Sequence, residues 1–320
     1  AEEAEGIDMK IALFGGAGFI GVNLVKALAA MHEHEITVID RQEEFFEPIR
    51  RMELPGVTYR ICDFPAEEHF EEFLQGQDMV YHLVSTTNPT TSNRGIAHEL
   101  DANIVATARF LESCITCRIK RVVFLSSGGT VYGKQQSCPL GEELPTYPIS
   151  SYGIQKITIE KLLYLYHYLH GLDYRVVRLA NPYGPYQRPN GVLGAVTSFT
   201  YKALRGEEIH VYGDGSVIRD FIYIDDAVRG ILNIAGKDQE QKVFNLGCGY
   251  GTSIRELLDK IETSLDIPLQ IRYEQARKVD VPVNYLDISR YEQQFGELHP
   301  IPLEEGIRKT AEFMKDYYKI

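Results

Sequence analysis

The chain has 320 residues, of which 44% are hydrophobic and 24% are charged, and its formal net charge is −12. This composition is typical of a globular protein, and the acidic balance disfavours nucleic acid as a partner because phosphate binding needs a basic surface. No apolar stretch approaches the roughly 20 residues that a membrane span needs, so we expect no association with a membrane.

A glycine-rich turn stands between a predicted strand and a predicted helix near the start of the chain. Residues 11–14 are an unbroken apolar run, typical of a buried strand, and residues 19–28 carry apolar side chains at helical spacing. Glycine lets such a turn bring backbone N–H groups to a pyrophosphate at the positive end of the helix. The predicted pyrophosphate site consists of Gly15, Gly18, Phe19, Ile20 and Gly21.

Acidic residues follow the next two predicted strands. Asp40 comes directly after the apolar run 36–39. A carboxylate there accepts hydrogen bonds from a ribose diol and repels a 2′-phosphate, so NAD is favoured over NADP as the cofactor. Asp63 comes just after the strand predicted over 57–61. Its carboxylate is expected to bind the adenine amino group or, alternatively, to cap the helix predicted over 66–74.

The alternation of strands and helices continues along the first half of the chain. Residues 78–84 predict a strand, and the polar, turn-rich residues 85–93 predict a loop over the cofactor. Residues 96–117 predict a long helix with Asn103 at its middle, where this side chain is either exposed or holds a catalytic lysine. A further strand is predicted over 121–125. This order predicts a parallel, doubly wound sheet with right-handed crossovers.

The five cysteines are scattered and odd in number, which is not the pattern of a disulfide framework. Cys114 and Cys117 have the spacing of a redox pair, but they lie near the end of a predicted helix, and no second pair completes a zinc site. We therefore expect structural cysteines, no metal ion, and a reducing cytoplasm as the location.

Hydroxyl side chains follow the strand predicted over 121–125. Ligands of doubly wound sheets bind beyond the carboxyl ends of the strands. Ser126, Ser127 and Thr130 are therefore expected to reach the ligand site.

Tyr152 and Lys156 stand four residues apart on a helix predicted to run to about His170. This spacing puts the phenol and the ammonium on one helical face. A free tyrosine has a pKa of about 10, and a neighbouring cation lowers it by about 1–3 units. Tyr152 is thus a candidate general base, with Lys156 stabilising its phenolate and binding the nicotinamide ribose. Both side chains are also expected among the cofactor-binding residues. The same spacing also occurs by chance on helices without any such role.

Five motifs in this order resemble the extended short-chain dehydrogenase/reductases, and specifically the NAD-dependent nucleotide-sugar epimerases and dehydratases. The resemblance spans about residues 9–318 and is carried by Gly-Gly-Ala-Gly-Phe-Ile-Gly at 15–21, Ser-Ser-Gly-Gly-Thr-Val-Tyr-Gly at 126–133, Tyr152-x-x-x-Lys156, Asn-Pro-Tyr-Gly-Pro at 181–185, and Tyr-Gly-Asp-Gly-Ser-Val-Ile-Arg-Asp at 212–220.

The resemblance implies an α/β fold with a Rossmann-type doubly wound parallel sheet and a smaller C-terminal lobe that binds the substrate. After a flexible leader at 1–8, residues 9–180 are expected to form the NAD-binding domain and residues 181–320 mainly the lobe for the nucleotide sugar. Members of the family commonly form homodimers through the helices that correspond here to 96–117 and 150–170, so a homodimer is expected.

The reaction that the resemblance favours is 4-epimerisation of a UDP-hexose. Tyr152 would remove the proton of the C4 hydroxyl, and a transient 4-keto sugar would turn and be reduced on its other face. Dehydratases and sugar-acid decarboxylases of the family carry an acid just before Val-Tyr-Gly, where this chain has Gly129 and Thr130. Two alternatives stay open: a nucleotide-sugar dehydratase or reductase of the same fold, and an NAD-binding sensor or scaffold without turnover.

One catalytic position departs from the family pattern. The usual catalytic serine or threonine falls on Gly128, so the hydroxyl that orients the substrate must come from elsewhere. Ser127 is favoured and Thr130 is the second choice, with Ser126 as a third source.

Substrate-binding residues are expected in the second half of the chain. Residues 209–212 and 217–224 predict a hairpin outside the main sheet. The resemblance assigns Arg219, within this hairpin, and Arg277, after it, to the UDP pyrophosphate; alternatively, each forms a surface ion pair. Asn284 falls where related epimerases control access for N-acetyl groups, and its small size favours admitting N-acetylated sugars. The predicted substrate-binding set is Asn181, Tyr212, Arg219, Arg277 and Asn284.

Overall fold

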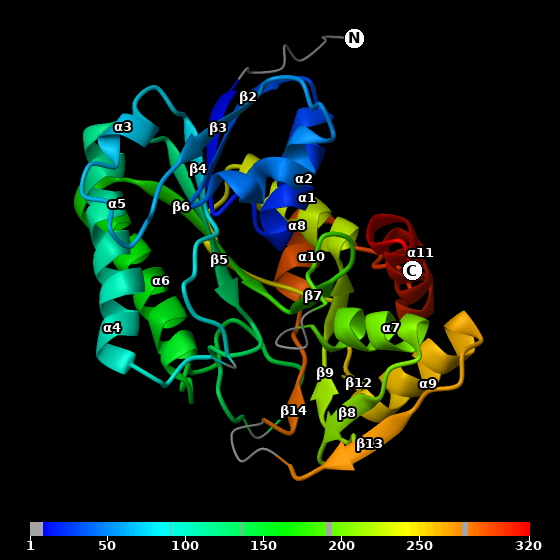
Figure 1. The fold of residues 1–320 in the computed structure, drawn as a ribbon. Coiled ribbons are helices and arrows are strands. Elements are labelled where there is room, and N and C mark those ends of the chain that lie inside the picture. The colour runs from blue at the N-terminus through cyan, green and yellow to red at the C-terminus, as the bar shows by residue number, and fades with distance from the viewer. Residues whose placement is uncertain (1–8, 90, 136, 190–193, 277–280) are drawn as a thin grey trace. The chain divides into compact units, whose positions relative to one another are not determined.

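The computed structural model describes residues 9–89, 91–135, 137–189, 194–276 and 281–320. The chain divides into two compact units (Figure 1). Unit 1 comprises Ala1–Ser126 and Ser150–Val176, and unit 2 comprises Ser127–Ile149 and Val177–Ile320. Residues 127–149 thus group with the C-terminal part of the chain.

Unit 1 alternates strands and helices. Its elements are β1 (Met9–Phe14), α1 (Phe19–Ala29), β2 (His34–Asp40), η1 (Glu43–Phe46), α2 (Glu47–Arg50), β3 (Val57–Ile61), α3 (Glu71–Leu74), β4 (Met79–His82), α4 (Ile96–Leu100), η2 (Asp101–Val105), α5 (Ala106–Thr116), β5 (Arg121–Ser127), α6 (Ser151–His170) and β6 (Asp173–Leu179), of which β5 and β6 end in unit 2.

Unit 2 has shorter strands. Its elements are β7 (Asn181–Tyr183), α7 (Ala195–Arg205), β8 (Ile209–Tyr212), β9 (Ile218–Arg219), β10 (Phe221–Tyr223), α8 (Ile224–Gly236), β11 (Val243–Leu246), β12 (Thr252–Ser253), α9 (Ile254–Leu265), β13 (Ile271–Glu274), β14 (Val283–Asn284), α10 (Ser289–Phe295) and α11 (Leu303–Tyr318).

The predicted doubly wound sheet is confirmed. Seven strands follow the order β11-β6-β5-β4-β1-β2-β3, and the pairs β1–β2, β1–β4, β2–β3 and β4–β5 are parallel. The strand order reverses between β1 and β4, and such a reversal opens the sheet to a ligand beyond the carboxyl ends of the two strands. The glycine turn after β1 and the polar loop after β4 both lie at this edge.

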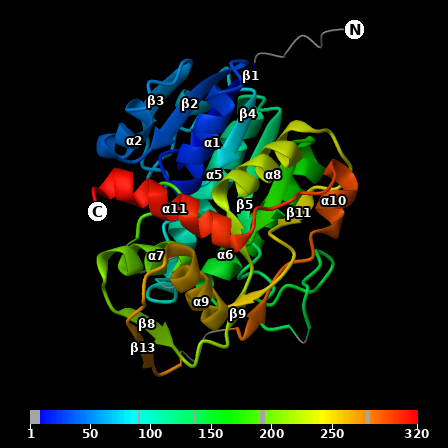
Figure 2. The same ribbon diagram turned by 90° about the vertical axis from the view of Figure 1, so that its right-hand side faces the viewer.

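Helices cover both faces of the sheet in unit 1. Figures 1 and 2 show α1 on one face and α5 with α6 on the other. The second face is sealed by an aromatic cluster in which Phe14 of β1 packs edge-on against Phe110 of α5 at 5.1 Å between ring centroids. Edge-to-face packing of this kind stabilises a core beyond the area that the rings bury.

The predicted helix over 96–117 contains a π-helical turn. Residues Asp101–Val105 form η2 between α4 and α5, and Asn103 lies inside it. A π turn inserts one residue into the helix and is often found at functional sites. Here it directs the side chain of Asn103, which is 5% exposed, into the interior of unit 1.

The predicted hairpin over 209–224 is wrong. β8 pairs in parallel with β13, whereas β9 pairs with β12 and β14, and β10 pairs with β7. Asp220 stands between β9 and β10 and is fully buried. Its carboxylate accepts hydrogen bonds from distant backbone N–H groups, so the chain leaves one sheet for another at this residue instead of continuing as one strand.

Three helices of unit 2 pack on one another. α11 contacts α7 and α9, and α7 contacts α9, as Figure 2 shows from their side-by-side position. Ile209 and Val211 of β8 and Leu258 of α9 form a small hydrophobic core. Over the described ranges, no helix has the length and apolar character that crossing a membrane requires.

Candidate functional site

The glycine turn after β1 is packed so closely that side chains would not fit at Gly15, Gly16 or Gly21. Gly15 has φ +78°, and a Cβ atom there would lie 3.0 Å from the backbone of Leu83. A Cβ atom on Gly21 would lie 2.4 Å from the carbonyl oxygen of Gly16. The turn leads directly into α1, with Gly18 as the N-cap and Phe19 and Ile20 as the first residues of the helix. This cradle suits a pyrophosphate.

Asp40 lies at the end of β2, beside the same turn. Its carboxylate accepts hydrogen bonds from the backbone N–H groups of Ala17, at 3.1 Å, and Arg41, at 2.9 Å. The acid is thus held next to the glycine turn, where a ribose would extend from a pyrophosphate. Asp63 is exposed, and the role given to its side chain stays a prediction.

Hydrogen bonds join the loop after β4 to η2 and to α6. Thr86 donates its N–H to Oδ1 of Asn103 at 3.0 Å, and Asn103 donates from Nδ2 to Thr86 Oγ1 at 2.7 Å. Thr87 donates to Gln155, the neighbour of Lys156 in the sequence, at 3.2 Å. Asn103 thus holds the loop, and no hydrogen bond between Asn103 and Lys156 occurs in the described part of unit 1.

Tyr152 and Lys156 lie on one face of α6, as predicted from their spacing. The ammonium group of Lys156 lies 5.5 Å from the centre of the Tyr152 ring and 4.8 Å from that of Phe124. It donates a hydrogen bond of 2.8 Å to the carbonyl oxygen of Leu125. Burial lowers the pKa of Lys156 to about 8, while the charge of Glu160 opposes this shift. The helix starts at a serine cap, Ser150, which accepts from Gly153.

His82, at the end of β4, forms part of the surroundings of Lys156. Burial lowers the pKa of His82 to about 3, and the charge of Lys156 adds to this shift. The ring makes a hydrogen bond of 2.8 Å with Thr107. The imidazole is therefore neutral near pH 7, and Lys156 is the ionised group of this pair.

Ser126 does not serve as a free hydroxyl. Its Oγ donates to the Glu160 carboxylate at 2.5 Å, and the serine is 5% exposed. This contact removes the third source of the missing hydroxyl and leaves Ser127 and Thr130.

The segment after β5 contains two consecutive glycines, Gly128 and Gly129, whose surroundings differ. A Cβ atom on Gly128 would lie 2.5 Å from Leu286, so this position faces packed side chains and cannot present a hydroxyl. A Cβ atom on Gly129 would fit in ordinary van der Waals contact with Ser127 Oγ, at 3.9 Å, and Asn181 Oδ1, at 3.8 Å. The Thr130 hydroxyl is buried without a hydrogen-bond partner among the described residues. Ser127, Thr130 and Asn181 therefore stay candidates for substrate contacts.

Asn284 holds the same segment from β14. It is 1% exposed, and its Nδ2 donates to the carbonyl oxygen of Gly128 at 3.3 Å. Its Oδ1 is buried with no partner in the described ranges. Asn284 is paired in register with Arg219 of β9, whose guanidinium donates to the carbonyl oxygens of Ile218 and Val281.

Asp220 fastens the surroundings of Asn181. Its carboxylate accepts from the N–H groups of Cys248, at 2.7 Å, and Leu286, at 3.3 Å, and its own carbonyl oxygen accepts from the Asn181 amide at 2.9 Å. Burial raises the pKa of Asp220 to about 6, and the backbone hydrogen bonds oppose this shift. The Asp220 carboxylate thus holds the loops that contain Cys248 and Leu286 in place by accepting hydrogen bonds from their backbone.

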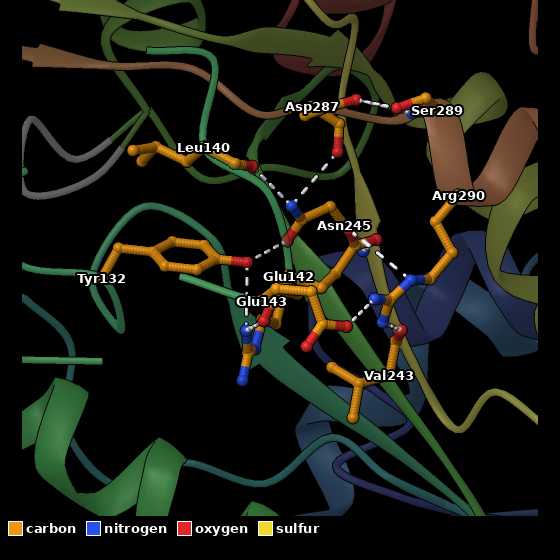
Figure 3. A network of polar contacts seen from close by, with 10 residues as sticks. Tyr132, Leu140, Glu142, Glu143, Val243, Asn245, Asp287, Ser289 and Arg290 are labelled. Carbon is orange, nitrogen blue, oxygen red and sulfur yellow. Dashed lines mark hydrogen bonds and ion pairs between the residues drawn. The ribbon is translucent and has the colours of Figure 1, made fainter. Parts of the chain in front are cut away.

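Figure 3 shows a polar network that includes Tyr132 of the Val-Tyr-Gly segment. Tyr132 donates to Asn245 Oδ1 at 2.6 Å, and Asn245 donates to the carbonyl oxygen of Leu140 at 2.7 Å. Arg178 donates to the Tyr132 hydroxyl at 3.0 Å. Burial raises the pKa of Tyr132 to about 12, so this phenol stays protonated. The Tyr132 phenol is consequently held in this network by its hydrogen bonds to Asn245 and Arg178.

Two of the predicted substrate-binding residues, Tyr212 and Arg277, are not seen next to Ser127, Thr130, Asn181 or Asn284 in the described part of the structure. Tyr212 ends β8, in the sheet with β13, and is 40% exposed. Arg277 lies outside the described residues. Their roles stay predictions.

Three residues of the site escaped the sequence reasoning. Glu160 could have been found, because it is an acid four residues after Lys156 and therefore on the same helical face. Thr86 and Asp220 gave no such signal, since their partners are distant in the sequence.

Comparison with known proteins identifies relatives along most of the chain. The model of the NAD dependent epimerase/dehydratase family matches residues 11–247. The UDP-glucose 4-epimerase of Mycolicibacterium smegmatis is 31% identical over 313 residues, which cover 96% of this chain and 99% of that protein.

Solved structures agree with this likeness. The UDP-glucose 4-epimerase of Thermotoga maritima, solved with UDP-glucose, matches with a TM-score of 0.89 and 33% identity over 97% of this chain and 100% of that one. The UDP-glucuronic acid 4-epimerase of Bacillus cereus, solved with UDP-glucuronic acid and NAD, matches with a TM-score of 0.89 and 26% identity over 97% and 100%.

Proposed function

Since this chain belongs to the NAD dependent epimerase/dehydratase family, we propose that it is a 4-epimerase of a UDP-hexose. UDP-glucose and UDP-galactose are the first candidates for its substrates, and N-acetylated forms are the second. The relatives from M. smegmatis and T. maritima support the first pair by their own activity.

The residues of unit 1 fit the cofactor of the family. The closely packed glycine turn leads into the N-terminus of α1, and the Asp40 carboxylate stands beside it to accept hydrogen bonds from the ribose hydroxyls. NAD supplies hydride-transfer chemistry when it is bound. The protein's own part is to hold the cofactor, to move a proton and to orient the sugar.

We assign the proton transfer to Tyr152. Its phenol lies one helical turn from the buried ammonium of Lys156, which is fixed by the Leu125 carbonyl. A fixed cation favours the phenolate and makes it a base for the C4 hydroxyl near neutral pH. The substrate hydroxyl is oriented by Ser127, with Thr130 as the second choice.

Unit 2 is assigned the nucleotide part of the substrate. Asn181, Arg219 and Asn284 carry the contacts, to which Tyr212 and Arg277 are added on the ground of their motifs. Epimerisation requires that the nucleotide be held more firmly than the hexose, because the sugar must present both faces.

The feature that favours epimerisation over dehydration is the segment before Val-Tyr-Gly. Positions 129 and 130 hold glycine and threonine, and the Cβ side of Gly129 faces the Ser127 hydroxyl and the Asn181 amide oxygen. Elimination of water needs a further proton donor, which a carboxylic acid at this place provides. The segment has hydroxyl groups to orient a sugar and no acid to drive elimination.

The test is to incubate the purified protein separately with UDP-galactose, UDP-N-acetylgalactosamine and UDP-glucuronic acid, without added NAD and with NAD in parallel. Products are resolved by anion-exchange chromatography and NMR. We expect UDP-galactose to reach equilibrium with its C4 epimer. A 4-keto-6-deoxy product would indicate the dehydratase alternative. Unchanged sugars together with NAD binding would indicate a sensor or scaffold, and either result would overturn the epimerase assignment.

A homodimer formed through α4 and α6 is part of this proposal. Ile154, Leu165 and Leu169 are 44–58% exposed at helical spacing on α6, and Ile96 is 50% exposed on α4. An apolar surface shared by two adjacent helices marks a contact with another protein. The five thiols are free, which fits the cytoplasm that we propose as the location.

We expect a mass twice the chain's 36.3 kDa in light scattering at micromolar concentration. Introducing Leu165→Glu and Leu169→Glu together should give a monomer, because two buried charges would face an apolar partner. Ile271→Glu, on exposed β13, is the matched control and should stay dimeric. A wild-type monomer would contradict the proposed dimer.

A further inference from the structure

Two buried side chains of α6 are anchored on consecutive residues of β5. Lys156 donates to the carbonyl oxygen of Leu125 at 2.8 Å, and one turn later Glu160 accepts from Ser126 Oγ at 2.5 Å. Both side chains are 5% exposed. Residues four apart on a helix lie one above the other, so the acid is held on the same face as the ammonium.

Burying the Glu160 carboxylate beside β5 costs free energy, which other interactions must offset. Taking a carboxylate out of water is unfavourable unless it is hydrogen-bonded and compensated by a charge. The Ser126 hydroxyl supplies the hydrogen bond, and Lys156 supplies the opposite charge. Without an acid, burial of Lys156 would favour its neutral form, which cannot stabilise a phenolate.

We propose that Glu160, held in place by Ser126, is a positioning residue that keeps Lys156 protonated beneath the Tyr152 phenol. This role rests on the base and cation that the proposed function assigns to Tyr152 and Lys156. Glu160 acts through Lys156 and does not touch the substrate.

The other groups around the pair do not replace this charge. His82 of β4 faces Lys156 as a neutral ring, because burial and the ammonium lower its pKa to about 3. Tyr174 of β6 lies near Glu160, and burial raises its pKa, so it stays a neutral phenol. Phe124 of β5 offers only the face of its ring. Glu99 of α4 binds Gln155 and the backbone of residues 93–95.

The sign of the pH dependence follows from this arrangement. Lys156 loses its proton as the pH rises through about 8, and the Tyr152 phenolate then loses its stabilising cation. Turnover should therefore decline on the alkaline side. Removing the negative charge of Glu160 should move that decline to lower pH.

The experiment titrates Lys156 directly by NMR, with ¹³Cε-labelled lysine and Lys156→Met to assign the signal, and records kcat against pH in parallel. Glu160→Gln should lower the pKa of Lys156 by at least about 1 unit and shift the alkaline limb of kcat equally. Ser126→Ala keeps the Glu160 carboxylate but removes the hydrogen bond that holds it, and it should lower the pKa of Lys156 by a smaller amount. Glu160→Asp should restore part of the wild-type value.

Glu112→Gln, the same change on an exposed site of α5, is the matched control and should leave both curves unchanged. An unshifted Lys156 titration in Glu160→Gln overturns the proposal, and so does one in Ser126→Ala if Glu160→Gln does not fold. The NMR titration needs no turnover, so it stands even if the epimerase assignment fails.

Discussion

Replacing Tyr152 by phenylalanine is expected to reduce kcat for C4 epimerisation by about 10³-fold, within the range that a positioned acid or base contributes. The ring and its contact with Lys156 are retained, and only the hydroxyl that accepts and returns the proton is lost. Cofactor binding should persist, because the glycine turn and Asp40 do not involve this phenol. Turnover of UDP-galactose and NAD titration by calorimetry measure the two properties.

Tyr273→Phe removes an exposed phenol from β13 and serves as the control, with activity expected to equal that of the wild type. Retained turnover in Tyr152→Phe would remove the assignment of the base. A parallel loss of NAD binding would instead indicate that the substitution had disturbed the fold of unit 1.

Introducing a methyl group at Gly21 is expected to abolish NAD binding and to lower the free energy of unfolding by about 3 kcal/mol, the upper end for overpacking. A Cβ atom there would lie 2.4 Å from the Gly16 carbonyl oxygen, and backbone atoms cannot turn aside as a side chain can. The turn would have to open, which moves its N–H groups away from the pyrophosphate.

Thermal unfolding with and without NAD provides the measurement. Wild-type protein should show a higher Tm with NAD, whereas Gly21→Ala should start lower and gain nothing from NAD. Gly236→Ala, at the end of α8, is the matched control, since no atom lies within 4 Å of its added Cβ. A normal NAD-dependent gain in Gly21→Ala would show that the turn does not bind the cofactor.

The fold of unit 1 could be predicted because its signals are local. Apolar runs such as 11–14, the glycines that follow and the i, i+4 pair Tyr152 and Lys156 are each readable within a few turns of chain. Strands that alternate with helices leave few possible topologies, so local patterns sufficed for the sheet. The family membership and its NAD dependence followed from the same motifs.

Pairing in unit 2 could not be predicted in this way. The two segments around 209–224 look like a hairpin, yet β8 pairs with β13 more than 50 residues later. Asp220, between β9 and β10, is held by backbone donors of loops that are remote in the sequence. Such contacts depend on burial and are invisible in the local sequence.

The sequence by itself determined which chemical groups this protein has: the glycine turn, the phenol, the ammonium and the absence of an acid at positions 129 and 130. Only the tertiary structure decided their states. In the folded chain the Ser126 hydroxyl donates a hydrogen bond to Glu160, and Gly128 packs against Leu286. Lys156 is buried, which lowers its pKa to about 8. The reason is physical, because hydrogen-bond occupancy, close packing and desolvation arise from partners that the chain brings together only when it folds.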